Sequence, residues 1–520
     1  MAVINVDFKK LEEMSGHSEK EIIDCLTNIG MPVEAGEDGA LVVEVTPNRP
    51  DLFCVEGITR AVRAYYNKEV KEYQAEPSEY SIGVSKKTEK VRPAICAVVV
   101  KGLEFDEEFL ADLMQMQEKL HDTIGRRRKK VAVGVHDLDK IKGKMDYLVA
   151  TKEKFVPLEL EEELDVIGVL KTHPKGVAFS HLVEGNAVII TDELGVVSFP
   201  PIINSERTKV TAETKNVLIE STGTSLQTVE KVVNIIACAL ADRGGKIFQV
   251  KVGGVVYPDF KYEKVSRELG EANRVLGLNL SKEEADEALL KMGIRSEGEM
   301  ALIPPYRADI ISPTDVLEDI AIGYGYDKMV PTLPKISTVG SGFEKEEPFL
   351  EILSGMGFIE TKNYVLTNMD KLKSTNREAG ALRILNSASE EFTYLRTSLI
   401  PGILNCFATN KMKGLPQQIY EIGRFYKDGK EADSLCFGIM QEGASLTSLQ
   451  PYLQTLSNNL GKNIELEAYD NDSCFIGGRC AKISVDGKEC GILGSVHPEV
   501  LEKFGLEHAV AICEIDLGKF

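Results

Sequence analysis

From end to end, the chain alternates short β-rich apolar runs with longer segments whose apolar residues recur at helical spacing. Residues 95–100 form a β-rich run, and residues 105–124 follow with apolar side chains three and four positions apart. A helical segment over 226–243 ends at Gly244-Gly245, where glycine favours a helix C-terminus. No segment approaches the roughly 18 consecutive apolar residues that a membrane span needs. The pattern predicts an α/β and α+β multidomain fold without a membrane-spanning helix.

The length of the chain and the positions of its prolines and glycines predict how it divides into domains. A chain of 520 residues accommodates about three or four domains. Prolines and glycines between 331 and 342 mark a linker, and the polar stretch 68–90 predicts a linker or a sheet-edge segment. We expect four domains, which are an N-terminal α+β domain (1–75), a mixed α/β domain (91–262), a small helical domain (265–335) and a C-terminal domain (343–520).

Charge and cysteine content narrow the class of protein. A formal net charge of −20 argues against a protein that coats nucleic acid non-specifically, although it leaves room for local basic contacts. Ten cysteines without a Cys-x-x-Cys pair predict buried thiols rather than disulfides or a zinc site. The N-terminus has no basic region followed by an apolar stretch, so we expect a cytoplasmic protein.

The strongest local signal is an acidic cluster around a predicted helix start at Ser312-Pro313. On that helix Asp315, Glu318 and Asp319 share one face, and Asp309 precedes it in an extended segment. Four converging carboxylates require a cation, and oxygen ligands without His or Cys favour Mg²⁺. The alternative is structural, because Asp315 completes a capping box with Ser312 and the other carboxylates can face solvent.

A second polar cluster lies between 200 and 224. A β-rich run begins at 217 and continues into the last residues of this cluster. Because side chains alternate between the two faces of a strand, Glu220 and Thr222 lie on the same face. Such side chains around a cleft can hold a polar ligand and orient a water molecule, whereas the alternative is a polar loop with ordinary turn chemistry. The candidate site residues are Asn204, Glu206, Thr211, Asn216, Glu220 and Thr222.

Other polar features are less specific. The basic run Arg126–Lys130 either meets a nucleic-acid backbone or is a solvated face. Among the apolar C-terminal strands, Arg396, Glu421 and Arg424 are either active-site remnants or buried ion pairs. The chain contains no phosphate-binding loop, no Gly-x-Ser-x-Gly and no His-Glu-x-x-His, which disfavours most self-contained kinases and hydrolases.

Four stretches together resemble one family. They include Pro47-Asn48-Arg49-Pro50-Asp51, Pro200-Pro201-Ile202-Ile203-Asn204 and Ile303–Asp309 followed by 318–326. The fourth combines 395–402 with 421–424. In their order and spacing, the stretches are similar to the β subunit of phenylalanyl-tRNA synthetase in its shorter archaeal and eukaryotic form.

The resemblance implies a ligase subunit in an (αβ)₂ heterotetramer that joins phenylalanine to tRNA(Phe), with ATP used in the α subunit. It implies that 343–520 is a catalytically inactive class II synthetase-like antiparallel core that does not bind ATP. It implies a winged-helix-like small domain with one Mg²⁺ per β chain, held by Asp309, Asp315, Glu318 and Asp319. It further implies that 91–262 is a tRNA-editing domain that hydrolyses mischarged Tyr-tRNA(Phe) in a pocket formed by the six candidate residues above.

Editing is chemically reasonable, because a hydrophobic pocket rejects an analogue with one added hydroxyl only about a hundredfold. The sequence leaves two alternatives open. One is a non-catalytic scaffold that binds tRNA and stabilises the α subunit, which the lack of an obvious nucleophile permits. The other is a free-standing deacylase.

Overall fold

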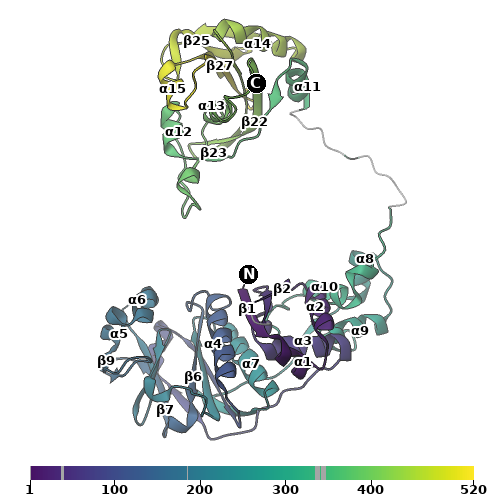
Figure 1. Cartoon of the computed structure of the whole chain (residues 1–520), viewed down its shortest axis with the longest axis vertical. Helices are drawn as coiled ribbons and strands as arrows, with labels where there is room; N and C mark the ends of the chain where they lie inside the picture. The colour runs from purple at the N-terminus through teal and green to yellow at the C-terminus, as the bar shows by residue number, and fades with distance from the viewer. Residues whose placement is uncertain (1, 37–39, 184, 334–339, 341–346) are drawn as a thin grey trace. The chain divides into compact units, whose positions relative to one another are not determined.

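The computed structural model describes residues 2–36, 40–183, 185–333, 340 and 347–520. The chain divides into two compact units, Met1–Leu333 and Pro334–Phe520. Within the described residues, no helix has the length and apolar character that crossing a membrane requires. Both units combine sheets with packed helices, so the predicted mixed α/β and α+β multidomain class is confirmed (Figure 1).

The first unit begins with a three-stranded antiparallel sheet in the order β1-β3-β2. Its strands alternate buried and exposed residues, as expected where one face meets a core. The elements are β1 (Ala2–Asp7), α1 (Phe8–Ser15), α2 (Glu19–Asn28), β2 (Val33–Ala35), β3 (Ala40–Val45) and α3 (Val55–Asn67).

A ten-stranded sheet forms the largest part of this unit, in the order β12-β11-β10-β7-β4-β14-β5-β13-β6 with β15 beside β14. The strands are β4 (Ser81–Val84), β5 (Ala94–Lys101), β6 (Val131–Asp137), β7 (Met145–Val149), β10 (Val188–Asp192), β11 (Gly195–Phe199), β12 (Ile203–Asn204), β13 (Asn216–Gly223), β14 (Lys246–Val252) and β15 (Val255–Tyr257). The sheet curls, so that its two terminal strands, β12 and β6, lie in contact.

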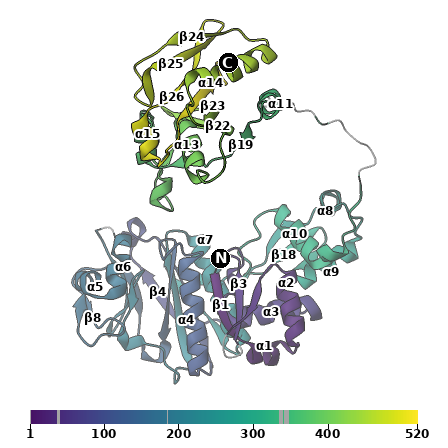
Figure 2. The same cartoon turned by 45° about the horizontal axis from the view of Figure 1, so that its top comes forward.

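Helices cover the sheet on two sides. The helices α4 (Glu107–Asp122) and α7 (Leu226–Asp242) lie between the large sheet and the N-terminal elements (Figures 1 and 2). One continuous apolar core therefore joins the first 75 residues to the large sheet. The short helices α5 (Val166–Thr172) and α6 (Pro174–Phe179) close a separate apolar cluster over β10 and β11. Beside it lies a small ribbon of β8 (Lys154–Phe155) and β9 (Leu164–Asp165).

The prediction of a linker or edge segment over 68–90 is wrong for its second half. This stretch contains β4, which pairs in parallel with both β7 and β14 inside the large sheet. The strand is short and Ile82 is its one buried residue, so the apolar pattern that marks an interior strand is absent. Backbone pairing with two neighbours, which no residue pattern encodes, places the strand there.

The unit ends with a small three-stranded sheet and three helices. The elements are β16 (Glu263–Ser266), α8 (Leu269–Leu276), α9 (Lys282–Lys291), β17 (Arg295–Glu297), β18 (Met300–Ile303) and α10 (Pro313–Tyr324). The predicted starts at Ser281 and Ser312 are confirmed, since each serine forms a capping box with the acidic residue three positions on. Gly323 allows α10 to approach the Ala288 carbonyl of α9, a contact that any Cβ would block.

The second unit is built on a seven-stranded sheet in the order β19-β22-β23-β27-β26-β25-β24. All of its pairs are antiparallel except β19 with β22. The strands are β19 (Ile359–Glu360), β22 (Gln417–Lys427), β23 (Lys430–Met440), β24 (Ile464–Ala468), β25 (Phe475–Val485), β26 (Lys488–Val496) and β27 (Val510–Asp516). A separate ribbon joins β20 (Leu366–Thr367) to β21 (Tyr394–Leu395).

Helices cover both faces of this sheet (Figure 2). Residues of α11 (Glu347–Gly355) and α14 (Leu446–Leu460) pack into one core, and those of α13 (Ile400–Thr409) and α15 (Pro498–Lys503) pack into another. The helix α12 (Met369–Ser374) completes the unit. Finer assignments, such as a winged helix in the first unit or a class II core in the second, remain predictions, as do the four domain boundaries.

Candidate functional site

The first candidate site is a cavity of about 240 Å³ where the two ends of the large sheet approach each other. Strands β11 and β12 supply one side, β6 and β13 the other, and α4 lines a third. Asn204 Nδ2 on β12 donates a 3.3 Å hydrogen bond to the carbonyl of Val135 on β6, which ties the two ends of the sheet together. The cavity therefore exists only because the sheet curls.

The centre of the cavity is a cradle of polar atoms over Gly134. Glu220 is the antiparallel cross-strand partner of Gly134, and His136 lies two residues along on the same face of β6. A Cβ at position 134 would lie 2.5 Å from Glu220 Oε1, 2.8 Å from His136 Nε2 and 3.0 Å from Asn204 Oδ1. These are hydrogen-bond distances, so an oxygen near this point meets three polar partners at once.

Neighbouring hydrogen bonds orient the cradle. Ser198 Oγ donates to Glu220 Oε1 at 2.9 Å and lies 3.2 Å from Asn204 Oδ1. His136 Nδ1 lies 2.9 Å from the hydroxyl of Thr208, and its Nε2 lies 3.9 Å from Glu220 Oε1. Both side chains of the Glu220–His136 pair are almost fully buried. The pair is therefore held in place by Ser198 and Thr208, which come from two other segments of the chain.

Within the described residues, two buried atoms of this pair, Glu220 Oε2 and His136 Nε2, have no hydrogen-bond partner. A buried polar atom without a partner costs about 1–3 kcal/mol, so such atoms mark places where a ligand or water is bound. Apolar side chains continue the cavity wall beside them, including Val135, Phe199 and Ile202. The arrangement suits a ligand with an apolar body and a hydroxyl at its buried end.

The open end of the cavity is charged. Arg128 Nη2 donates to Glu118 Oε1 at 2.7 Å, and Lys175 Nζ lies 3.5 Å from the same oxygen. Burial by itself raises the pKa of Glu118, but the adjacent His121 and the charges of Arg128 and Lys175 outweigh it and hold that pKa below its usual range. Burial also lowers the pKa of His121, whose Nε2 accepts a 2.9 Å hydrogen bond from the Val133 amide. His121 therefore lines the cavity wall with its Nε2 already bonded to the backbone.

The structure brings two of the six candidate residues, Asn204 and Glu220, into this cavity. Thr222 shares the face of Glu220 but accepts a 2.9 Å hydrogen bond from the buried Arg92. Glu206 accepts a 2.8 Å hydrogen bond from the Glu159 amide just outside the cavity. Asn216 is bonded to Asp139, and the Thr211 amide donates to Thr214, so neither lines the cavity.

Sequence reasoning did not select Gly134, His136 or Ser198. A signal existed for Gly134, because an isolated glycine within a β-rich run indicates a close approach by another group. No local pattern marked Ser198 or His136 as polar residues of a cavity.

The second candidate site is a cavity of about 520 Å³ that all four predicted metal ligands line, together with Arg49 and Arg307. Arg307 binds Asp309 through two hydrogen bonds of 2.8 and 2.7 Å, and its Nη2 donates to Asp319 at 2.8 Å. Burial raises the pKa of Asp319 to about 6, and the Arg307 charge offsets part of that rise. The Arg307 charge also holds the pKa of Asp309 below its usual range against the effect of burial.

The other two carboxylates are not bound by Arg307. Asp315 Oδ2 accepts hydrogen bonds from the amides of Ile311 and Ser312, as the capping alternative predicts. Glu318 is exposed. Among the described residues, no three His, Cys, Asp or Glu side chains are grouped closely enough to hold a metal ion. The four carboxylates still suit Mg²⁺, which prefers oxygen ligands. Their four negative charges exceed the two positive charges of Arg49 and Arg307 in the same cavity.

In the second unit, the polar residues among apolar strands form a buried ion pair. Arg396 Nη1 lies 2.5 Å from Glu421 Oε1, and both side chains are buried. Arg424 is exposed and pairs with Glu431. Of the two interpretations left open, the buried ion pair is therefore the one that the structure supports for Arg396 and Glu421.

The chain was also compared with known protein families and proteins. Three family models match, which are the B3/4 domain over 125–236, the tRNA synthetase B5 domain over 265–326 and the phenylalanyl tRNA synthetase beta chain CLM domain over 330–517. Phenylalanine–tRNA ligase beta subunits from Archaeoglobus fulgidus and Methanothrix thermoacetophila are 39% and 34% identical. The alignments cover 100% of this chain and 99% and 100% of those relatives.

A solved structure is also similar. The N-terminal fragment of the phenylalanyl-tRNA synthetase beta subunit from Pyrococcus horikoshii is 34% identical, with a TM-score of 0.59. The match covers 62% of this chain and 99% of that fragment.

Proposed function

Because the chain belongs to the phenylalanyl-tRNA synthetase beta-subunit family, we propose that it acts with an α subunit on tRNA(Phe) in the cytoplasm and hydrolyses mischarged Tyr-tRNA(Phe). In this proposal the α subunit attaches phenylalanine with ATP, and the cavity of the first unit removes tyrosine. The cradle over Gly134 is the observation that carries the hydrolytic part.

The cradle supplies the discrimination that an apolar pocket lacks. Tyrosine differs from phenylalanine by one hydroxyl, which Glu220, His136 and Asn204 would bind at the buried end of the cavity. A phenylalanyl group would leave these buried polar atoms without partners, and sites built around a substrate hydroxyl reject the analogue that lacks it by about 10⁴–10⁵. The cognate product is thereby spared.

The ring would lie against the apolar wall, with the ester at the charged open end. In the reaction, a water oxygen bonds to the ester carbonyl carbon and the bond to the ribose oxygen breaks. The proton released by the water passes to that ribose oxygen. The residues of this chain bind and orient the tyrosyl group, and the free ribose hydroxyl of the substrate can assist the attacking water.

The test is hydrolysis of preformed Tyr-tRNA(Phe) by the complex with the α subunit. We expect Glu220→Gln to lower kcat/KM for hydrolysis by about 100-fold, because the amide replaces one acceptor with a donor, while phenylalanine charging is retained. Asn216→Ala is the matched control, since this residue lies on the same strand outside the cavity. Equal hydrolysis by parent and Glu220→Gln would favour the non-catalytic scaffold.

We also propose that the second unit packs against the α subunit in an (αβ)₂ heterotetramer and binds no ATP. Its support is exposed apolar surface around the β20–β21 ribbon, where Tyr364, Leu382 and Leu385 are 79%, 53% and 87% exposed. Leu382 accepts a backbone hydrogen bond from Leu395 of β21, and Ile384, next to Leu385, donates one to Thr393. The Tyr364 ring packs edge-on against Phe392, so all three apolar side chains lie near the ribbon. Apolar patches of this kind mark protein interfaces. Gel filtration of the chain alone and with α distinguishes this assembly from a free-standing deacylase.

For the acidic cavity, we propose one Mg²⁺ per chain. Asp315 and Glu318 would hold it first because Arg307 does not bind them, and Asp309 and Asp319 complete the donor set. The ion would neutralise the excess carboxylate charge and so stabilise the small domain. Mn²⁺ binding followed by electron paramagnetic resonance, with Glu318→Gln as the variant, tests this assignment.

A further inference from the structure

We propose that the loop Gly125–Lys130 binds the phosphate backbone at the 3′ end of the tRNA whose aminoacyl group enters the cavity. The inference rests on the proposed editing function and names the surface by which the same site holds its RNA. It is carried by the backbone of this loop, by the direction of its charges and by its position at the cavity wall.

The backbone of the loop is unusual. Arg126, Arg127 and Arg128 have φ values of 49°, 52° and 65°, three consecutive left-handed residues that each carry a Cβ. This conformation is unfavourable for such residues and persists only where the surroundings impose it, commonly at functional sites.

Buried contacts impose that conformation. The Arg92 guanidinium donates to the carbonyls of Arg128 and Lys129, at 3.2 and 3.4 Å. The Lys130 amide closes the loop with a 2.8 Å hydrogen bond to the Gly125 carbonyl. The loop is therefore a fixed platform rather than a flexible basic tail.

The platform divides its charges between two directions. Arg128 points inward, where it lines the cavity and donates a 2.9 Å hydrogen bond to the Ile202 carbonyl. Arg126, Arg127 and Lys129 are exposed, and none of them forms an ion pair within the part of the chain that the structure describes. Three unpaired cations thus flank a residue of the cavity wall.

This placement fits RNA phosphates. The tyrosyl ester is attached to the terminal ribose, so the nearest phosphates must lie beside the mouth of the cavity that receives it. The other cations at the mouth, Lys175 and Lys209, already pair with Glu118 and Glu206. In a chain of net charge −20, a local concentration of positive charge without ion-pair partners among the described residues attracts a polyanion.

The test uses hydrolysis of preformed Tyr-tRNA(Phe) by the complex of the full chain with the α subunit. For R126Q/R127Q/K129Q we expect KM to rise about tenfold with kcat within twofold of the parent, because the charges bind RNA and touch no reacting atom. The dependence of log kcat/KM on log salt concentration should become shallower by about 2, at roughly 0.7 for each single-strand phosphate that the variant no longer neutralises. R126K/R127K should keep the parent KM, since it preserves the charge.

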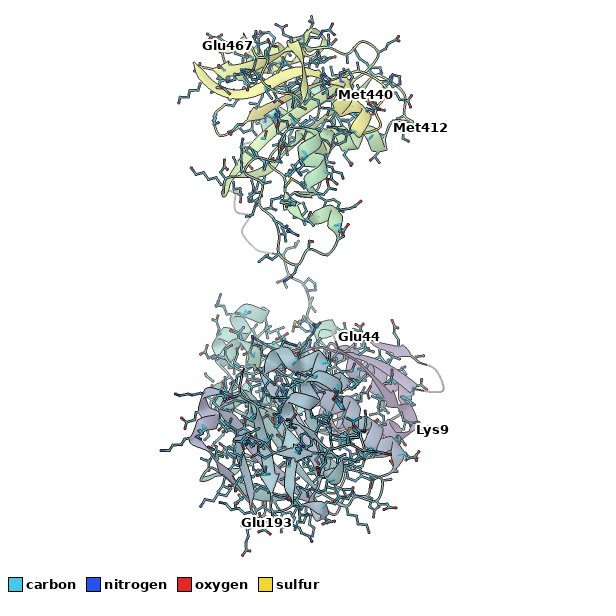
Figure 3. The ribbon with its side chains drawn as sticks, turned by 90° about the vertical axis from the view of Figure 1, so that its left-hand side faces the viewer. Lys9, Glu44, Glu193, Met412, Met440 and Glu467 are labelled. Atoms are coloured by element: carbon cyan, nitrogen blue, oxygen red, sulfur yellow. The ribbon has the colours of Figure 1, made fainter. Side chains whose placement is uncertain are left out.

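The matched control, K9Q/K20Q/K282Q, removes the same charge from exposed lysines of the same unit, on α1, α2 and the start of α9; Lys9 is labelled in Figure 3. A parent-like KM in the loop variant, or an equal rise in the control, overturns the inference and leaves the editing function intact. A parent complex without hydrolysis overturns both.

Discussion

Glu220 on β13 lies directly opposite Gly134 on β6, so the cross-strand neighbour of a buried carboxylate is the one residue type without a side chain. The space over Gly134 is what admits a substrate group to Glu220 and His136.

Gly134→Ala should abolish tyrosyl-tRNA hydrolysis. The new Cβ would occupy the cradle, 2.5–3.0 Å from three polar atoms, where a bound hydroxyl is proposed. We expect at least a 100-fold loss in kcat/KM for hydrolysis with phenylalanine charging within twofold of the parent. Gly270→Ala is the control, because its Cβ would meet nothing within 4 Å. Undiminished hydrolysis by Gly134→Ala would contradict the assignment.

Asp112→Asn should reduce the pH dependence of stability. Burial, with the Glu56 charge, raises the pKa of Asp112 to about 6, above the unfolded value of about 4. The folded state therefore binds the proton more tightly, and stability is lost as pH rises from about 4 to about 6. Between pH 4 and pH 6 we expect the free energy of unfolding of the variant to fall by about 1–2 kcal/mol less than that of the parent, since asparagine does not titrate.

The measurement for Asp112 is the urea midpoint of unfolding at pH 4.5 and 7, taken on parent and variant. The Asp112 side chain is about one-fifth exposed and accepts a 3.2 Å hydrogen bond from Arg243. Both features limit the difference in stability between variant and parent. The exposed Glu104→Gln is the control. A variant whose midpoint falls with pH as steeply as that of the parent would refute the prediction.

Arg307→Met should destabilise the first unit by about 3–5 kcal/mol, because Asp309 and Asp319 lose the cation between them. If the acidic cavity binds Mg²⁺, adding the ion should restore part of this loss, and thermal unfolding with and without Mg²⁺ measures it. Arg274→Met, which breaks an exposed pair with Glu271, should leave the stability of the first unit unchanged. No response to Mg²⁺ in the Arg307 variant would count against the metal proposal.

Arg396→Met and Glu421→Leu should each destabilise the second unit by about 3 kcal/mol, since either leaves an unpaired buried charge. The double variant should be less destabilised than the sum, because neither charge remains. Circular-dichroism unfolding in urea measures the cycle. Additive losses would mean that the pair is not coupled.

Leu385→Glu should weaken co-elution with the α subunit, because it places a charge on apolar surface that the proposed interface buries. The exposed Leu194→Glu in the first unit is the control. Met412, also exposed and shown at the periphery of the second unit in Figure 3, provides a second site for the same test. If Leu385→Glu and a charged substitution at Met412 both leave complex formation unchanged, the α subunit binds elsewhere.

Local signals predicted local structure well. The starts of α9 and α10 could be predicted from Ser281 and Ser312 because each capping box closes within four residues. The short strand β4 could not be predicted, since it has one buried apolar residue and depends on two distant neighbours.

The candidate site shows the same limit. Asn204 and Glu220 were selected from a polar segment, but Thr222, on the same face, is bonded to Arg92 instead of lining the cavity. Ser198 and His136 line one site only because the curled sheet brings β12, the neighbour of β11, into contact with β6.

The sequence by itself determined the family, the alternation of strands and helices, and the acidic helix start. These features depend on neighbouring residues and on long motifs in a fixed order. Only the tertiary structure decided that Arg307 binds two of the four acidic side chains and that a glycine opens the cradle. Both outcomes depend on side chains far apart in the chain, whose distances are set when the sheet curls and the helices pack.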